Sequence, residues 1–163
     1  MRVIAYDSQP SQEARDLGIE FVPLETLLSE SDFVSVHVAL TSQTRGLFGE
    51  AQLRRMKPSA YLINTSRGPV VNEPALLKAL QEQWIAGAAL DVYEVEPLAS
   101  DHPLRTAPNI LLSPHQSSFG RETGARVSAA AAQAIVDLKN GRRPRWVVDP
   151  TVYDSSLLRV KMA

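Results

Sequence analysis

Short apolar runs alternate along this chain with segments of helical character, and this alternation restricts the fold more than any other feature. The apolar runs span about four to six residues and are bounded by Gly, Pro, Ser, Asp or Asn, as strands commonly are. We predict strands at 2–6, 19–22, 33–38, 60–63, 85–90 and 109–112. We predict helices at 11–17, 24–31, 49–56, 72–83 and 121–140. Because strands that alternate with helices form parallel sheets covered on both faces, the sequence predicts an α/β fold.

The composition fits a globular chain and argues against several other classes. Hydrophobic residues make up 44% of the 163 residues and charged residues 21%, which is typical of a domain with a core. The net charge of -1 provides no basic stripe for nucleic acid, and no apolar run reaches the length of a membrane span. The N-terminus lacks the apolar core of a signal peptide, and the absence of cysteine fits a reducing compartment. We therefore expect a cytoplasmic protein without nucleic-acid or membrane partners.

Three segments place charged side chains directly after predicted strands. They are Asn-Thr-Ser-Arg-Gly at 64–68, Asp-Val-Tyr-Glu-Val-Glu-Pro at 91–97 and Ser-Pro-His at 113–115. The carboxyl ends of parallel strands meet at one edge of a sheet, and open α/β folds bind their ligands there. An arginine, a carboxylate and a histidine at that edge can hold an anionic substrate and move a proton.

These segments, together with 36–41 and 87–90, resemble the NAD-dependent D-2-hydroxyacid dehydrogenases, also called D-isomer-specific 2-hydroxyacid dehydrogenases. The similarity runs in order from Arg2 to about Pro150. The resemblance implies a Rossmann-like doubly wound parallel sheet and an oxidoreductase activity. It implies NAD as the cofactor and a small 2-hydroxy or 2-oxo acid as the substrate, with no metal. It also implies a homo-oligomer, for which we expect a dimer.

Arg67 and His115 are the first two candidate catalytic residues. Arg67 precedes Gly68 in a strand-to-loop turn, where a guanidinium can bind a carboxylate with two hydrogen bonds, although residue type alone favours a surface arginine. His115 follows Pro114, and imidazole can exchange a proton near neutral pH, although a structural loop histidine has the same pattern. The resemblance implies that Arg67 orients the acid and polarises its carbonyl. It implies that His115 is the general acid/base and also borders the cofactor.

Glu96 is the third candidate catalytic residue, and Glu94 is its competitor. A carboxylate beside an imidazole favours the imidazolium and fixes its tautomer. The two glutamates are two residues apart, so both would point the same way in an extended segment, and the residues alone do not separate them. The resemblance implies Glu96, which directly precedes Pro97. The other histidines are His37 and His102, and we expect neither to be the catalyst.

Asp7 ends the first predicted strand and is the main candidate for binding the nucleotide. In dinucleotide-binding folds an acid at such a strand end binds the ribose hydroxyls, and it would repel a 2′-phosphate, so NAD is favoured over NADP. An aspartate in a simple turn is the alternative. The resemblance implies further contacts to NAD at Val38, Thr65, Ser66 and Asp91, with Asp91 on the nicotinamide side.

The sequence departs from the resemblance because G-x-G-x-x-G does not occur among its eight glycines. The ribose-binding acid normally lies about twenty residues after this motif, yet six residues precede Asp7. In the strand order 3-2-1-4-5-6 the first strand would lie between 2–6 and 33–38, whose inner edges would then be unpaired. We weigh a truncated gene product, one half of a split enzyme, and a sheet in which these two strands pair directly. We favour truncation.

The chain divides into three parts under this interpretation. Residues 1–116 form a partial dinucleotide-binding domain, 117–141 a long crossover helix, and 142–163 a tail that belongs to the substrate domain in intact relatives. The chain would then be a fragment of an oxidoreductase that transfers a hydride between a 2-hydroxy acid and NAD, with little activity alone. The alternative is a non-catalytic binding or regulatory module, or one half of a split dehydrogenase, that associates through its open sheet edge.

Overall fold

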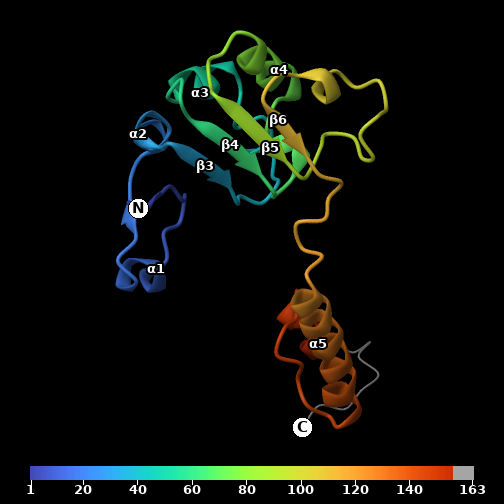
Figure 1. The fold of residues 1–163 in the computed structure, drawn as a ribbon. Helices are drawn as coiled ribbons and strands as arrows, with labels where there is room; N and C mark the ends of the chain where they lie inside the picture. The colour runs from blue at the N-terminus through green and yellow to red at the C-terminus, as the bar shows by residue number, and fades with distance from the viewer. Residues whose placement is uncertain (156–163) are drawn as a thin grey trace. The chain divides into compact units, whose positions relative to one another are not determined.

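The computed structural model describes residues 1–155, which divide into two compact units, one over residues 1–117 and one from residue 118 onward (Figure 1). The strands are β1 (Ile4–Ala5), β2 (Glu20–Phe21), β3 (Phe33–Val36), β4 (Tyr61–Asn64), β5 (Gly87–Leu90) and β6 (Ile110–Leu112). The α-helices are α1 (Gln12–Asp16), α2 (Leu24–Glu30), α3 (Glu50–Arg55), α4 (Glu73–Gln81) and α5 (Arg121–Lys139). Short 3-10 helices are η1 (Gly68–Val70), η2 (Pro103–Thr106) and η3 (Pro150–Asp154).

The first unit is built on a four-stranded sheet with the order β3-β4-β5-β6, in which every neighbouring pair is parallel. This arrangement confirms the predicted parallel α/β fold. β1 and β2 form a separate parallel pair, and β1 does not pair with β3, so the interpretation in which these two strands join directly is wrong. β3 is shorter than predicted because its ladder ends where Val36 pairs with Asn64, the last residue of β4.

One face of the four-stranded sheet carries the hydrophobic core. Alternate residues Val34 and Val36 of β3 are buried, and the neighbouring strands add Leu62, Ala88 and Leu90. α2 packs against α3 and α3 against α4, and the three helices follow one another along one side of the sheet (Figure 1). This layer holds the strands in register and thereby fixes the positions of their carboxyl ends.

The opposite face of this sheet is open in the described part of the first unit. Phe33 and Tyr61 stack there with ring centroids 5.6 Å apart, and they stay 64% and 44% exposed. Leu111 of β6 is also exposed. Helices of the first unit therefore cover one face of the sheet, whereas the alternation of strands and helices predicts cover on both.

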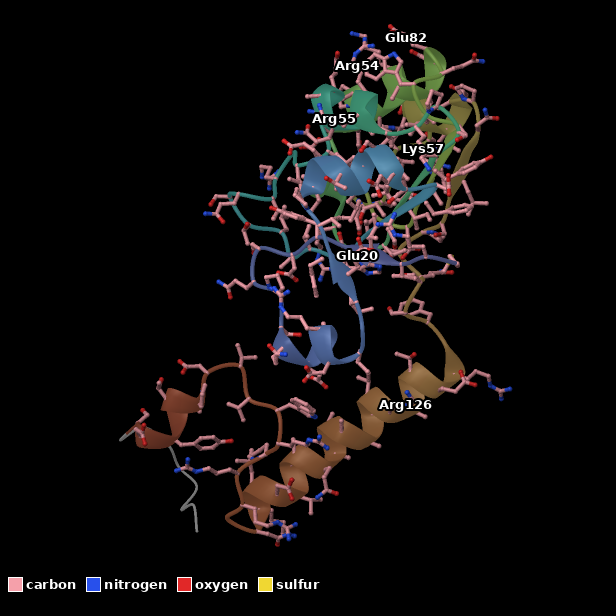
Figure 2. All side chains as sticks on the ribbon, turned by 90° about the vertical axis from the view of Figure 1, so that its left-hand side faces the viewer. Glu20, Arg54, Arg55, Lys57, Glu82 and Arg126 are labelled. Atoms are coloured by element: carbon pink, nitrogen blue, oxygen red, sulfur yellow. The ribbon has the colours of Figure 1, made fainter. Side chains whose placement is uncertain are left out.

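Charged side chains lie on the outside of the helical layer. Figure 2 shows Arg54, Arg55 and Glu82 near one another on the α3–α4 side of the first unit. The guanidinium of Arg54 lies 3.5 Å from the ring centroid of Trp84, and its Nη2 lies 3.7 Å from Oε2 of Glu82. Charged side chains therefore lie between the helical layer and solvent at this place.

The second unit consists mainly of α5, which confirms the helix predicted at 121–140. The helix ends at Asn140 and Gly141, whose φ of 70° is the left-handed conformation that suits glycine after a helix. Arg142 turns back and donates hydrogen bonds to Asp137. Residues 156–163 of the predicted tail at 142–163 lie outside the described residues. No described helix has both the length and the apolar character needed to span a membrane.

Candidate active site

Three loops emerge side by side from the carboxyl edge of the four-stranded sheet. They follow Asn64 of β4, Leu90 of β5 and Leu112 of β6, whose strands are neighbours in the sheet. The segments 64–68, 91–97 and 113–115, which sequence patterns single out, therefore start from one edge. Each loop is held by a different set of hydrogen bonds, and these sets define the geometry of the site.

His115 and Glu96 form the central contact of the site. Nδ1 of His115 lies 2.7 Å from Oε2 of Glu96, and both side chains are partly exposed. The other carboxylate oxygen, Oε1, accepts a hydrogen bond of 3.0 Å from the backbone N–H of Tyr93. The hydrogen bond to His115, helped by that from Tyr93, holds the pKa of Glu96 below its usual range, so the carboxylate is ionised near neutral pH. Because an ionised carboxylate only accepts hydrogen bonds, Nδ1 carries a proton and Nε2 is left for a ligand.

The geometry separates the two glutamates that the sequence leaves open. Glu96 reaches His115, whereas the carboxylate of Glu94 lies on the surface, 3.9 Å from Nη1 of Arg45. The segment turns between Tyr93 and Glu96 instead of running extended, so the two carboxylates do not point the same way. Glu96 is therefore the glutamate that forms the pair with His115.

Asp91 fixes the loop that carries His115. Its side chain is 3% exposed, and Oδ1 accepts hydrogen bonds from Oγ of Ser113 at 2.6 Å and from the backbone of Gln116 at 2.8 Å. Oδ2 accepts from the backbone of Ser117 at 2.9 Å. Burial raises the pKa of Asp91, but hydrogen bonds from Ser113, Ser117 and the loop backbone outweigh burial and hold the pKa well below its ordinary value. Asp91, predicted to contact the nicotinamide side of NAD, thus uses both carboxylate oxygens within its own chain.

The backbone at His115 is held in an unusual conformation. Its φ is 53°, in the left-handed region, and its N–H donates to the carbonyl oxygen of Asp91 at 2.8 Å. The hydroxyl of Tyr93 donates to the carbonyl oxygen of Ser113 at 2.8 Å, two residues before His115. These contacts fix the turn from both ends and hold the imidazole against Glu96.

Asn64 organises the loop that carries Arg67. Asn64 is fully buried, its Nδ2 donates to the carbonyl oxygen of Arg67 at 3.0 Å, and its Oδ1 accepts from both the backbone and the hydroxyl of Ser66. The Arg67 side chain is exposed, and its Nη1 donates to the carbonyl oxygen of Ser66. Asn64 belongs to the 64–68 motif, but the sequence patterns do not predict its own role; a polar residue at the buried end of a strand is the signal that identifies such a role.

Gly68 brings the Arg67 loop against the Glu96 loop. A Cβ atom at this position would lie 1.9 Å from both the carbonyl carbon and the oxygen of Tyr93, which no real Cβ can do. The backbones of the two loops are therefore in direct contact, and only glycine permits it. A cleft of about 560 Å³ lies beside them, with Glu96, His115 and Arg105 in its lining.

The other residues predicted for the cofactor follow the strand ends. Val38 lies just after β3 and is half-buried, while Thr65 and Ser66 follow β4, the neighbouring strand. Asp7 follows β1, which belongs to the separate strand pair, and its exposed carboxylate accepts a hydrogen bond from the backbone of Gln9. Thr65 and Ser66 thus offer hydroxyls after β4, and Asp7 offers a carboxylate of the kind that binds ribose hydroxyls in dinucleotide-binding folds. The sequence offers no G-x-G-x-x-G for the pyrophosphate.

The two remaining histidines have separate surroundings. Nε2 of His37 lies 2.8 Å from the hydroxyl of Ser35 on the exposed surface. Nε2 of His102 lies 3.3 Å from the buried carboxylate of Glu73. No group of three or more His, Asp and Glu side chains among residues 1–155 has the geometry to hold a metal ion.

The sequence of this chain is similar to that of known proteins. Residues 1–117 match the family model described as D-isomer specific 2-hydroxyacid dehydrogenase, NAD binding domain. The chain is 50% identical over 153 residues to a glyoxylate reductase of Korarchaeum cryptofilum, and the match covers 93% of this chain and 46% of that protein. It is 45% identical over 143 residues to glyoxylate/hydroxypyruvate reductase B of Klebsiella pneumoniae, with 88% and 44% covered.

Solved structures show the same similarity. The NAD-complexed D-isomer specific 2-hydroxyacid dehydrogenase of Lactobacillus delbrueckii ssp. bulgaricus superposes with a TM-score of 0.81 at 33% identity, over 91% of this chain and 48% of that one. The chain thus spans somewhat less than half the length of the relatives that it matches.

Proposed function

Because this chain belongs to the D-isomer-specific 2-hydroxyacid dehydrogenase family, we propose that it forms the NAD-binding part of an enzyme that interconverts a small 2-oxo acid and the 2-hydroxy acid. The predicted family and the predicted Rossmann-like fold are both confirmed by the family model and by solved relatives. The single observation that carries the proposal is the 2.7 Å contact between His115 and Glu96, at the sheet edge that also carries Arg67. The proposed activity belongs to the whole enzyme, of which this chain supplies one side of the site.

We propose that His115 moves the proton. When the hydroxy acid is oxidised, neutral Nε2 accepts the proton of the C2 hydroxyl; when the oxo acid is reduced, the imidazolium returns it to the carbonyl oxygen. Glu96 accepts the hydrogen bond from Nδ1, which keeps Nε2 free for the substrate and stabilises the imidazolium. Reduction consumes the protonated form of His115 and oxidation the neutral form, so the two directions are expected to have opposite pH dependence.

We propose that Arg67 binds the substrate carboxylate. Its guanidinium is exposed at the sheet edge, and Gly68 presses its loop against the segment that carries Glu96. A guanidinium offers two parallel hydrogen bonds to a carboxylate and draws electron density from the adjacent carbonyl. The acid would thereby be oriented with C2 and its oxygen toward His115.

We propose that residues at the carboxyl ends of the strands hold NAD, which would supply the hydride acceptor for oxidation at C2 of the hydroxy acid and, as NADH, the hydride donor for reduction of the oxo acid. Val38, Thr65 and Ser66 would contact the nucleotide, Asp91 and His115 would border the nicotinamide, and Asp7 would bind the ribose. Asp91 would act mainly by holding the 113–117 loop beside the nicotinamide, because its oxygens already accept three hydrogen bonds.

We propose glyoxylate and hydroxypyruvate as the first substrates to test, since relatives with 45–50% identity are named reductases of these acids. The assay joins this chain behind the N-terminal part of the Korarchaeum cryptofilum glyoxylate reductase and follows NADH oxidation. His115→Asn should lower kcat by about 10²- to 10⁴-fold, and His37→Asn, a surface histidine of the same chain, should leave kcat unchanged. Retention of kcat in the His115→Asn enzyme would refute the assignment.

The isolated chain serves as a second test. Without a G-x-G-x-x-G loop it should bind NAD weakly and turn over little, as measured by calorimetry and by the same NADH assay. Turnover by the isolated chain as fast as by the joined enzyme would show that the pyrophosphate needs no such loop.

A homodimer and a cytoplasmic location also remain predictions, to be tested by the mass in solution and by cell fractionation. The open edges of β1 and β3 favour a second candidate function, a module that binds a partner strand. A defined complex that binds no NAD would support the module over the dehydrogenase.

A further inference from the structure

Glu73 is a buried carboxylate that the proposed catalytic steps do not use. Among the described residues, the buried polar or charged side chains are Asn64, Glu73 and Asp91. Asn64 holds the loop of Arg67, and Asp91 holds the loop of His115. The third loop of the site carries Glu96. Glu73 accepts a hydrogen bond from the backbone of this loop.

The carboxylate of Glu73 is held between two donors. Glu73 is the first residue of α4, directly after the N-cap Asn72. Its Oε1 accepts a hydrogen bond of 2.7 Å from the backbone N–H of Glu94, and its Oε2 lies 3.3 Å from Nε2 of His102. Its side chain is 9% exposed, and a buried carboxylate without donors would be costly, so both contacts matter.

The surroundings of His102 define its tautomer. Nδ1 of His102 accepts a hydrogen bond of 3.3 Å from the backbone N–H of Leu104, so the ring proton of the neutral form lies on Nε2. His102 therefore donates to Glu73. Leu104 is fully buried, and this anchors the histidine to the core.

The contacts of Glu73 lead directly to the site. Glu94, which donates to Glu73, shares a peptide bond with Tyr93, whose N–H donates to Oε1 of Glu96. Oε2 of Glu96 then meets Nδ1 of His115. Two successive backbone N–H groups of the turn are thus fixed, one by the buried carboxylate and one by Glu96 itself.

We propose that Glu73 and His102 form a positioning pair that holds the 93–96 turn and thereby sets the carboxylate of Glu96 against His115. The proposal deepens the proposed function, on which it rests for the catalytic meaning of the Glu96–His115 contact. Neither Glu73 nor His102 touches the substrate or the cofactor in this arrangement. The pair acts only through Glu96.

The test follows the titration of Glu96 in the 163-residue chain by carbon NMR of the side-chain carboxyl, with Glu96→Gln to assign the signal. The carboxyl groups of Glu96 and Asp91 repel each other, while His115 and the N–H of Tyr93 hold the pKa of Glu96 below its usual range. In Glu73→Gln only the amide oxygen can accept a hydrogen bond, so either the N–H of Glu94 or His102 loses its acceptor and the turn loses part of its support. The pKa of Glu96 should therefore rise toward the ordinary value of about 4.3.

His102→Asn tests the pair without altering the carboxylate. The asparagine oxygen can still accept from Leu104, but the side chain is too short to reach Glu73, so the pKa of Glu96 should rise here as well. His37→Asn is the matched control and should leave the titration of Glu96 unchanged. If Glu73→Gln does not fold, His102→Asn decides the question alone.

An unchanged pKa of Glu96 in a folded variant that is merely less stable would reduce Glu73 and His102 to a structural role and overturn the proposal. No substrate enters this measurement, so it can fail while the dehydrogenase activity stands. Conversely, full kcat in the His115→Asn joined enzyme would refute the proposed function, while a measured change in the pKa of Glu96 in the Glu73 and His102 variants would still stand. In the joined enzyme the pair should act on kcat, with KM for the acid nearly constant, because Arg67 is untouched.

Discussion

The two sides of the first unit are fixed to very different degrees. On the β4–β6 side, buried polar side chains hold each loop of the candidate site from within the core. On the β1–β2 side, each strand has two residues, no residue before Leu28 is buried, and the main polar tie is the exposed Arg2 with its partners Glu20 and Glu30. The side that carries the His115–Glu96 pair is thus preorganised by its own chain, whereas the side that carries Asp7 is not.

The largest expected loss of stability comes from a substitution at Gly68, on the β4–β6 side. Gly68→Ala puts a Cβ into the backbone of Tyr93, which cannot move aside as a flexible side chain could. We expect the free energy of unfolding to fall by at least about 3 kcal/mol, measured by urea titration. Gly49→Ala is the control in the same unit, because its nearest neighbour is 3.6 Å away and the variant should lose only the N-cap preference for glycine over alanine, about 1 kcal/mol or less. Equal stability of the two variants would contradict the close contact.

The next effect concerns the charge beneath the His115 loop. Asp91→Asn leaves at least one of three loop donors without an acceptor, which should cost about 2 kcal/mol of stability at neutral pH. Because the pKa of Asp91 is lower in the folded chain than in the unfolded one, its contribution is full above about pH 4 and is lost as the pH falls below that value. Urea titrations from neutral to acid pH should therefore show a smaller acid loss in the variant. Identical pH profiles would argue against the three hydrogen bonds.

Hydrogen exchange compares the two sides without any substitution. Amides in β4 and β5, which have a parallel strand on each side, should exchange slowest, and those of β1 and β2 fastest among the strands. Mass spectrometry of deuterium uptake measures this directly. Protection of β1 equal to that of β5 would mean that its outer edge is covered in solution, as the strand-binding module requires.

The smallest expected effect comes from a substitution at Arg2, on the β1–β2 side. Arg2→Gln removes both ion pairs, but all three side chains are half-exposed and water screens such pairs. We expect no resolvable change in global unfolding and a local increase of exchange confined to β1 and β2. A global loss of stability would show that β1 is coupled to the core more tightly than its burial suggests.

Sequence patterns predict the strands and the edge at which the site lies, because apolar runs and the residues after them are local signals. They do not separate Glu96 from Glu94, since the decision depends on the turn that Tyr93 and Glu96 close with a hydrogen bond. They also miss the role of Glu73, whose backbone partner Glu94 lies 21 residues away in the sequence. Contacts of that kind arise only when the strands are in register, and no local pattern of residues encodes them.

The left-handed backbone of His115 has a consequence for mutational scanning at this position. A φ of 53° is tolerated best by glycine and asparagine, while alanine and especially β-branched residues are strained there. A full substitution library would therefore rank variants at position 115 by backbone compatibility when expression is scored, with Gly and Asn near the top and Val and Ile near the bottom. An alanine scan would mix this strain with the loss of the imidazole, and the asparagine variant gives the cleaner measure of the side chain itself.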